Sequence, residues 1–224
     1  MILAGLVRVE GQHADKAGKA VAVDASVEVV AADHPWVSRG GVKLAAALDV
    51  FSILPVGKRC LDVGASTGGF THVLLERGAV QVVALDVGRG QLDWRLRQDP
   101  RVVVKEGVNA RYLGKEDLSG PFDLVTVDVS FISLRLVLPA LVPLLADSGD
   151  LVALIKPQFE AGRSQVARGG VVRDAIVREE AIEGVVAAAQ AIGLACLGRV
   201  PSPIPGPAGN VEELTHLRHR EQSG

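Results

Sequence analysis

The sequence has few cysteines, no long apolar run and almost no net charge, and each absence narrows the possibilities. No run reaches the roughly eighteen apolar residues of a transmembrane helix, so no spanning helix is expected. The amino terminus has no basic stretch ahead of a long apolar segment, which argues against a signal peptide. Cys60 and Cys196 lie in or beside apolar strand-like runs and suit buried free thiols in a reducing cytoplasm. Too few ligands cluster together for a zinc site, so no metal is expected.

The formal net charge of −2 gives no general attraction to polyanions, but the basic residues are unevenly placed. Two stretches are rich in them: Arg89, Arg95, Arg97, Arg101, Lys105 and Arg111 form the first, and Arg163, Arg168, Arg173 and Arg178 form the second. Such a stretch either forms a local basic face that holds phosphates or is an ordinary solvated surface. The sequence leaves both interpretations equally open.

Apolar residues are plentiful, at 48% of 224 residues, and suffice for the core of one α/β domain. Strand-like runs alternate with helical patterns from Val37 onward. We predict helices over 40–51, 68–77, 90–98, 133–145 and 172–192, and strands over 58–63, 80–86, 101–105, 122–128, 151–155, 194–200 and 211–219. Continuous apolar strands separated by helices are typical of a parallel sheet covered on both faces, so a doubly wound α/β fold is predicted.

A glycine-rich segment joins the first two predicted strands and is the most informative part of the chain. It reads Leu-Asp-Val-Gly-Ala-Ser-Thr-Gly-Gly-Phe over residues 61–70, and the next strand ends at Asp86. In a nucleoside-binding βαβ unit the glycines let the backbone approach a ligand, and the carboxylate accepts hydrogen bonds from ribose hydroxyls. Asp62 stands where the dinucleotide pattern G-x-G-x-x-G has its first glycine, so a ligand without a pyrophosphate fits better. This favours S-adenosylmethionine over NAD.

Two further polar residues follow predicted strands, at the edge of the sheet where ligands bind in such folds. Asp128 ends the strand over 122–128, and Lys156 comes directly after the strand over 151–155. Alone, Asp128 could cap a helix and Lys156 could extend to the surface. Together on one edge they form a possible acid–base pair, in which a partly desolvated lysine acts as a general base.

Five segments, in this order, resemble the TlyA family, which belongs to the FtsJ-like ribose 2′-O-methyltransferases of ribosomal RNA. They are Ser38–Leu44, Asp62–Phe70, Val127–Phe131, Ile155–Glu160 and Gly209–Glu212. The resemblance extends from Val37 to about Leu214. It implies a seven-stranded Rossmann-like methyltransferase fold, S-adenosylmethionine as cofactor, ribosomal RNA or ribosomal subunits as partner, and a cytidine ribose as target. Members have also been called haemolysins.

The catalytic tetrad Lys–Asp–Lys–Glu of the FtsJ-like group falls on Lys43, Asp128, Lys156 and Glu212. We choose Glu212 over Glu213 because the family pattern places its glutamate two residues after the asparagine. We expect Lys156 to be the general base and Asp128 to orient it. Lys43 and Glu212 are expected to hold the target nucleotide and to tune Lys156 electrostatically. The expected cofactor contacts are Asp62, Gly64, Ser66, Gly68, Gly69, Asp86 and Asn109. Of these, Asp86 would bind the ribose hydroxyls and Asn109 the adenine edge. Arg39 and Lys43 are expected to contact RNA.

Members of the family usually begin with an S4-type RNA-binding module, and residues 1–32 resemble only its carboxyl-terminal part. Short β segments at 6–9, 20–24 and 27–30 are too few to bury a core. Either the sequence begins inside the module or this member has a reduced one. Residues 33–37 are expected to be a linker, because proline at 35 disfavours helix before it, and 38–224 the methyltransferase domain.

Three other functions compete with this cytoplasmic enzyme. A base N-methyltransferase would commonly have an Asn/Asp-Pro-Pro-aromatic turn after the fourth strand, whereas the chain has Asp128-Val129-Ser130-Phe131. A small-molecule methyltransferase would show activity insensitive to salt, unlike an RNA-binding enzyme. A non-catalytic ribosome-associated protein would not need all four tetrad residues. The oligomeric state cannot be predicted.

Overall fold

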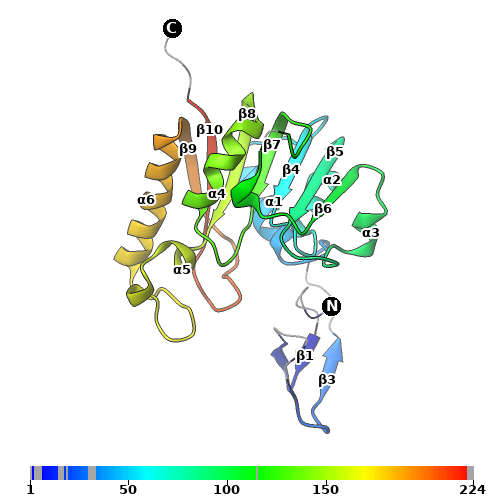
Figure 1. Ribbon diagram of the computed structural model, residues 1–224. Coiled ribbons are helices and arrows are strands. Elements are labelled where there is room, and N and C mark those ends of the chain that lie inside the picture. Colours follow the sequence, from blue (N-terminus) through cyan, green and yellow to red (C-terminus); the bar gives the residue numbers. More distant parts are fainter. Residues whose placement is uncertain are drawn as a thin grey trace.

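A seven-stranded sheet forms the centre of the molecule, and helices cover both of its faces (Figure 1). The computed structural model describes residues 2, 7–14, 18, 20–29, 34–114 and 116–220. In order across the sheet, the strands are β6 (Val102–Glu106), β5 (Gln81–Asp86), β4 (Arg59–Val63), β7 (Phe122–Val127), β8 (Leu145–Ile155), β10 (Glu213–His219) and β9 (Leu194–Pro201). The predicted Rossmann-like fold is confirmed.

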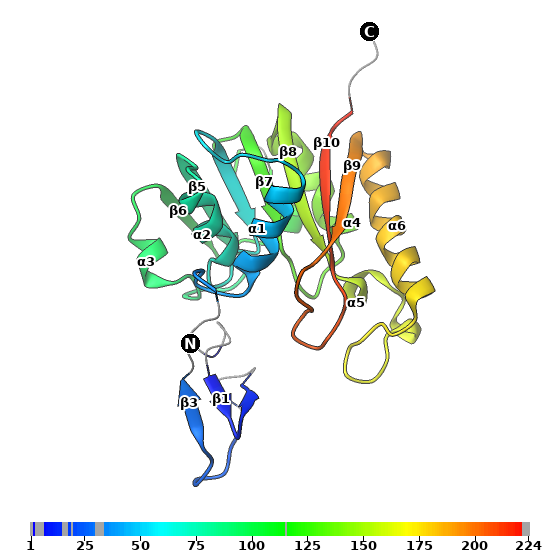
Figure 2. The same ribbon diagram turned by 180° about the vertical axis from the view of Figure 1, so that it is seen from behind.

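Two apolar cores lie on the two faces of the sheet because side chains alternate along each strand. In β4, for example, Leu61 and Val63 belong to one core and Cys60 to the other. The helices are α1 (Gly40–Val50), α2 (Gly69–Glu76), α3 (Trp94–Arg97), α4 (Leu134–Leu141), α5 (Pro157–Glu160) and α6 (Ala175–Ala191), with 3₁₀ turns η1 (Ala110–Tyr112), η2 (Val142–Leu144) and η3 (Arg163–Gln165). Side chains of α1 and α2 fill one core and those of α4 and α6 the other, as the opposite views in Figures 1 and 2 show.

The sheet is mixed, so the prediction of a parallel sheet was wrong at one edge. Strand β10 runs antiparallel to both β8 and β9. A parallel neighbour needs a crossover, which is usually a helix, and the chain between β9 and β10 contains none. The absence of a helical pattern between the last two predicted strands was a usable signal.

Two predicted helices are shorter than expected, and one strand is longer. The helix predicted over 90–98 is reduced to α3, which Asp93 caps by accepting a hydrogen bond from the Arg95 amide. The helix predicted over 133–145 ends at Leu141 and continues only as η2, because Pro143 has no amide hydrogen for an α-helical bond. Strand β8 therefore begins at Leu145 rather than at 151. Helix α5 was not predicted.

A small antiparallel sheet near the amino terminus consists of β1 (Val7–Val9), β2 (Gln12–His13) and β3 (Val27–Val29). Residues 20–24 form no strand, which corrects that prediction. The side chains of Val27 and Val29 are exposed, in keeping with strands too few to bury a core. The predicted boundary between this segment and the linker falls on residues 30–33, which lie outside the described residues. The likeness to an S4 module stays a prediction.

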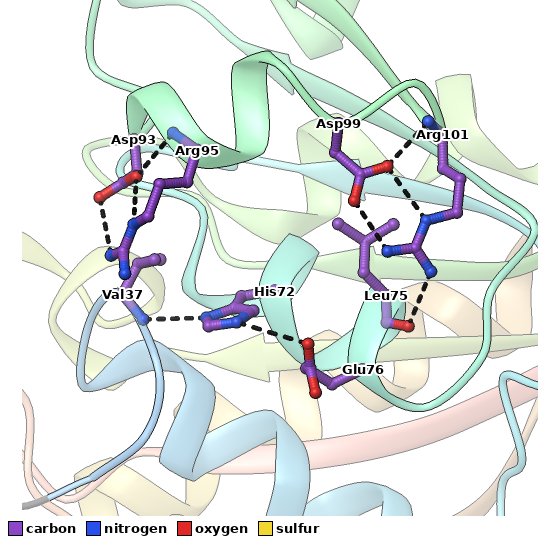
Figure 3. Close-up of polar contacts among 8 residues, drawn as sticks. All are labelled: Val37, His72, Leu75, Glu76, Asp93, Arg95, Asp99 and Arg101. Carbon is purple, nitrogen blue, oxygen red and sulfur yellow. Dashed lines mark hydrogen bonds and ion pairs between the residues drawn. The ribbon is translucent and has the colours of Figure 1, made fainter.

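The described part of the predicted linker, residues 34–37, is packed against the large domain rather than free. The Trp36 ring meets the His72 ring edge-on, with 5.5 Å between centroids. It also covers Gly41, where a Cβ atom would come within 2.3 Å of the indole. The Val37 amide donates a hydrogen bond to His72 Nδ1 at 3.2 Å, as Figure 3 shows. This segment therefore fixes the approach of the chain to α1 and α2.

Both cysteines are free thiols, as predicted. Cys60 is fully buried, and burial raises the pKa of its thiol to about 12. Cys196 is half-buried and contacts the Thr215 hydroxyl. None of the described helices combines the length and apolar character that crossing a bilayer requires.

Candidate active site

A cleft of about 320 Å³ opens at the carboxyl ends of β4, β5 and β7. Its volume lies within the range of small-molecule sites, roughly 300–1,000 Å³. The lining is Val63, Gly64, Ser66, Leu85, Asp86, Val87, Gln91, Val108, Asn109, Ala110, Asp128, Val129, Ser130, Phe131, Ile132 and Val137. Apolar walls with a few polar groups suit a ligand that has an aromatic ring and hydroxyl groups. Five of the predicted site residues line it: Gly64, Ser66, Asp86, Asn109 and Asp128.

Gly64 is the point at which the glycine-rich turn comes closest to the neighbouring strand. Its φ is +85°, and a Cβ atom there would lie 2.3 Å from the Asp128 carbonyl oxygen. The Asp128 amide donates to the Val63 carbonyl at 2.8 Å, which holds the two strand ends together. Only glycine accommodates both the left-handed backbone and this approach. The turn thus leaves its backbone open to the cleft.

Asp86 stands at the tip of β5, where the sequence predicted it. Its carboxylate accepts hydrogen bonds from the Ser66 amide at 2.8 Å and from the Gly88 amide at 2.6 Å. These bonds fix the orientation of the carboxylate at the cleft wall. An ionised carboxylate has about four acceptor positions, so two remain for hydroxyl groups of a ligand.

Asn109 lines the cleft, but part of its hydrogen-bonding capacity is already used. Its side-chain oxygen accepts from the Arg111 amide at 3.0 Å and caps η1. The side-chain amide N–H groups have no partner among the described residues. Its predicted contact with adenine therefore depends on these donors.

Asp62 does not line the cleft, contrary to prediction. Its side chain is fully buried and accepts hydrogen bonds from the hydroxyls of Thr71 at 2.7 Å and Thr126 at 3.1 Å. Burial raises the pKa of this carboxyl to about 7, although both hydroxyl contacts act in the opposite direction. Asp62 ties β4 to α2 and β7, and its predicted contact with the cofactor stays a prediction.

Gly68 and Gly69 do not line the cleft either. A Cβ atom on Gly68 would lie 2.3 Å from the Leu96 side chain, and one on Gly69 would lie 2.4 Å from Ser38 Oγ. Gly68, the N-cap residue of α2, also has a φ of +95°. These glycines are needed because α1 and the segment before β6 pack closely on the turn. The structure gives these two glycines packing contacts, and their predicted contacts with the cofactor stay predictions.

The predicted tetrad forms two ion pairs, and the first lies at the cleft. Lys156 Nζ is 2.6 Å from Asp128 Oδ1. The two groups form an ion pair whose angles do not fit a hydrogen bond. It also donates a hydrogen bond to Ser130 Oγ at 2.9 Å. The two charged side chains are 12% and 21% exposed, so a ligand in the cleft can reach them.

The second pair, Lys43 with Glu212, is buried. Lys43 Nζ donates to Glu212 Oε2 at 2.5 Å, and the side chains are 9% and 0% exposed. Glu212 lies just before β10 and points to α1, whereas Glu213 pairs with Arg199 on the other side, so the choice of Glu212 matches the geometry. Neither member of the pair is presented at the surface, which leaves the predicted grip on a nucleotide without support here.

Both pairs lie at one edge of the sheet. Glu213 faces Ile155 across the antiparallel ladder, so Glu212 and Lys156 are the next residues beyond that register pair. Arg39 immediately precedes α1 and, among the described residues, has no ion-pair partner. The sequence therefore located the polar groups correctly at the edge of the sheet but did not distinguish accessible from buried ones.

Comparisons with known proteins agree with this geometry. The sequence profile of the family described as FtsJ-like methyltransferase matches residues 36–219. The chain belongs to this family.

Relatives with similar sequences identify the group within this family that the chain resembles. The 16S/23S rRNA (cytidine-2'-O)-methyltransferase TlyA of Mycobacterium tuberculosis (strain ATCC 25618 / H37Rv) is 52% identical over 219 residues, which are 97% of this chain and 82% of the relative. Hemolysin A of Brachyspira hyodysenteriae is 43% identical over 218 residues, 97% of this chain and 90% of the relative. A solved structure of a hemolysin candidate from Streptococcus thermophilus has a TM-score of 0.84 and 44% identity, with 99% of this chain and 81% of that chain covered. The predicted resemblance to the TlyA family is confirmed.

FtsJ-like methyltransferases use S-adenosylmethionine, and the cleft residues fit that cofactor. Gly64 lets the backbone of the turn lie close to Asp128 at the cleft wall, and Asp86 has free acceptor positions for two ribose hydroxyls. The apolar residues Val108 and Ile132 lie where a flat adenine ring can pack. The predicted cofactor thus agrees with the chemistry of the cleft.

Among the polar and aromatic residues that line the cleft of this FtsJ-like methyltransferase, three were not predicted. Gln91 contacts the Ser66 hydroxyl, and nothing in the sequence pattern marks it. Ser130 holds Lys156, and Phe131 is 92% exposed with a φ of +65°. Both belong to the family segment Val127–Phe131, so the resemblance was a signal that could have found them.

Proposed function

We propose that the protein transfers a methyl group from S-adenosylmethionine to a ribose 2′-hydroxyl of ribosomal RNA. The observation that carries this proposal is the lysine amine held between Asp128 and Ser130 at the rim of a nucleoside-sized cleft. Methylation of a hydroxyl oxygen requires removal of its proton, whereas a neutral amine reacts without a base. A reachable lysine–carboxylate pair therefore favours an oxygen as acceptor.

S-adenosylmethionine, when bound, supplies an electrophilic methyl group. The residues of this chain then have two tasks, to position the ribose hydroxyl and to remove its proton. Lys156 accepts the proton on Nζ in its amine form, Asp128 stabilises the resulting ammonium, and Ser130 fixes the direction of the side chain. Proton removal by a positioned base accelerates such reactions roughly 10²- to 10⁴-fold.

An exposed aromatic ring at the cleft, that of Phe131, supports a nucleotide as substrate. Phe131 lies 5.2 Å from Phe159, centroid to centroid, and its backbone adopts the left-handed region that bulky residues rarely occupy. Exposed aromatic rings provide stacking surfaces for unpaired bases. A nucleotide inside folded RNA must leave its stack to reach Lys156, and a base stacked on Phe131 would stabilise that displaced state.

Cytidine in a ribosomal subunit is the substrate that we propose, because relatives such as the Mycobacterium tuberculosis protein are named for it. Since that substrate is made in the cytoplasm, the enzyme would act there. We also propose that the small sheet of β1, β2 and β3 is part of an S4-like module that adds RNA contacts.

The test is transfer of labelled methyl from S-adenosylmethionine to unmodified 30S and 50S subunits, followed by alkaline hydrolysis. A 2′-O-methyl group removes the hydroxyl that attacks the adjacent phosphate, so label is expected in alkali-resistant dinucleotides. Lys156→Ala should lower the turnover rate about 10²- to 10⁴-fold with cofactor affinity unchanged. Lys156→Arg should be equally slow, because arginine keeps the charge but cannot serve as a base. Lys105→Ala, which removes an exposed lysine that does not line the cleft, is the control.

Each other outcome contradicts the proposal in a distinct way. Label released as ordinary mononucleotides would indicate base methylation. Bound cofactor without transfer to either subunit would exclude these substrates. Near-normal turnover by Lys156→Ala would refute the role of Lys156.

A further inference from the structure

The second arginine-rich stretch carries unpaired positive charge beside the active site. Arg163, Arg168 and Arg173 lie in the segment between α5 and α6, where all three are exposed. None of them has a hydrogen bond or ion pair with another described residue. The one carboxylate of residues 161–174, Asp174, caps α6 by accepting from the Ile176 amide at 2.8 Å. The segment therefore presents three uncompensated guanidinium groups to solvent.

The first arginine-rich stretch is different, because carboxylates hold three of its six members. Arg95 contacts Asp93 at 3.0 Å and Arg101 contacts Asp99 at 2.7 Å, as Figure 3 shows. Arg97 contacts Glu106 at 2.5 Å. These pairs cancel much of the charge that the sequence shows there. The structure thus separates two stretches that the sequence left equivalent.

The middle of the second stretch is a small hairpin with Arg168 at its tip. Ala167 and Val171 form an antiparallel bridge, and the Ala167 amide donates to the Val171 carbonyl at 3.0 Å. Gly169 and Gly170 make the turn with φ values of +92° and +78°. No atom lies within 4 Å of a Cβ placed at either glycine, so the tip stands in open space. We call residues 167–172 the arginine hairpin.

Asn210 clamps the arginine hairpin to the segment that carries Glu212. It is 1% exposed, its side-chain oxygen accepts from the Val172 amide at 2.9 Å, and its side-chain nitrogen donates to the Gly170 carbonyl at 2.7 Å. A carboxylate could accept but not donate here, so the pair of bonds needs an amide. Figures 1 and 2 show the segment before α6 and the one between β9 and β10 side by side, below the end of the sheet where α5 begins. Lys156 immediately precedes α5.

We propose that Arg163, Arg168 and Arg173 bind backbone phosphates of the RNA on either side of the nucleotide in the cleft, with Asn210 as the residue that positions the hairpin. This inference rests on the proposed function. Guanidinium groups bind phosphate with two parallel hydrogen bonds. The arginines recur at every fifth residue of an exposed segment, which suits a row of phosphates better than one small anion. Each phosphate contact is sequence-independent and sensitive to salt.

The first experiment compares two triple variants of the full chain that lose the same charge. R163Q/R168Q/R173Q is expected to bind the subunit that the wild type methylates about 10- to 100-fold more weakly at 0.1 M salt. The slope of log affinity against log salt should fall by about 2–3, at roughly 0.7–0.9 for each lost contact. Affinity for S-adenosylmethionine, measured by calorimetry, should not change. The matched control R95Q/R97Q/R101Q should stay within about 3-fold of the wild type, because carboxylates already hold these arginines.

Equal losses in the two triple variants, or wild-type affinity and slope in R163Q/R168Q/R173Q, would overturn the inference. If the wild type methylates neither subunit, the proposed function itself fails. If the wild type methylates a subunit and R163Q/R168Q/R173Q does so with an unchanged KM, only the inference about the three arginines fails.

Asn210→Asp tests the positioning residue separately. It keeps the acceptor for Val172 and loses the donor to Gly170, so the hairpin is released while the three arginines remain. The expected result is a KM for subunits raised several-fold with kcat within about two-fold of the wild type, because the hairpin contributes to binding rather than to chemistry. A lower kcat at unchanged KM would instead place Asn210 with the catalytic groups and refute its positioning role.

Discussion

Replacing Asp62 with asparagine separates the structural role of this residue from the predicted contact with the cofactor. Asp62 is fully buried between Thr71 and Thr126, and its carboxyl has a pKa near 7 because of that burial. Asparagine has nearly the same shape and keeps an acceptor for Thr71, while its amide can donate to Thr126. We therefore expect Asp62→Asn to fold and to bind S-adenosylmethionine as the wild type does.

The magnitude follows from proton linkage. An ordinary aspartate has a pKa of about 3.8, whereas folded Asp62 titrates at about 7, so the folded state binds the proton more tightly. Stability is thus lost as pH rises from about 4 to about 7 and then levels off. At about 1.4 kcal/mol for each pH unit, the ionised carboxylate costs about 4 kcal/mol at pH 8. Asp62→Asn has no such loss, and about 3 kcal/mol of the difference should develop between pH 5 and pH 8.

Urea unfolding of both proteins at several pH values between 5 and 8 measures this difference. Subtracting one curve from the other removes groups that the two share, including His72, whose pKa burial lowers. Parallel curves would refute the burial argument. Loss of cofactor binding in Asp62→Asn would show that the carboxylate reaches the ligand after all. Asp86→Asn, which changes a carboxylate in the cleft wall, is the control that should lose cofactor affinity.

Two other substitutions test the close backbone approach at Gly64 and the ion pairs of buried Asp150. Gly64→Ala should weaken cofactor binding at least about 10-fold by calorimetry, because its Cβ would lie 2.3 Å from the Asp128 carbonyl oxygen. Gly57→Ala is the control for backbone strain alone, because Gly57 has a φ of +72° and no atom lies within 4 Å of its Cβ position. It should bind the cofactor normally. Equal cofactor affinity in the two variants would contradict the role of Gly64. Asp150→Asn should lower the free energy of unfolding by about 3 kcal/mol at pH 7, since the buried carboxylate holds Lys58, His216 and Arg218. Burial alone would raise the pKa of Asp150, but hydrogen bonds from these partners outweigh it and hold the pKa below its usual range. The loss of stability in Asp150→Asn, measured by urea unfolding, should therefore shrink below about pH 4. A loss that is constant with pH would refute this role of the carboxylate.

The sequence predicted the positions at strand ends well. Asp86, Asp128 and Lys156 each terminate or follow an apolar run, and in a sheet of this kind such ends converge at one edge. This convergence is a consequence of the backbone topology alone. It does not depend on how any particular side chain packs.

The environment of Asp62, Gly68 and Gly69 could not be predicted in the same way. Whether a glycine faces a ligand or a neighbouring side chain depends on what packs there, and Leu96 reaches Gly68 from a segment nearly thirty residues later. Likewise, Asp62 is buried because Thr126, in the adjacent strand, receives it. Both facts are properties of tertiary packing. A motif shared within a family therefore combines residues that contact ligand with residues that only support the turn.

The two ion pairs of the tetrad differ in exposure, and this difference indicates that they have different roles. Asp128 lines the open cleft and holds Lys156 beside it, so this pair can exchange a proton with a substrate. Lys43 and Glu212 are buried and join α1 to the start of β10, two residues from Asn210. Because Asn210 holds the arginine hairpin, this buried pair fixes the position of the hairpin relative to the helix that follows Arg39. The proposed catalytic pair and the proposed phosphate contacts therefore lie at the same end of the sheet, where Glu212 and Lys156 follow the register pair of Glu213 and Ile155.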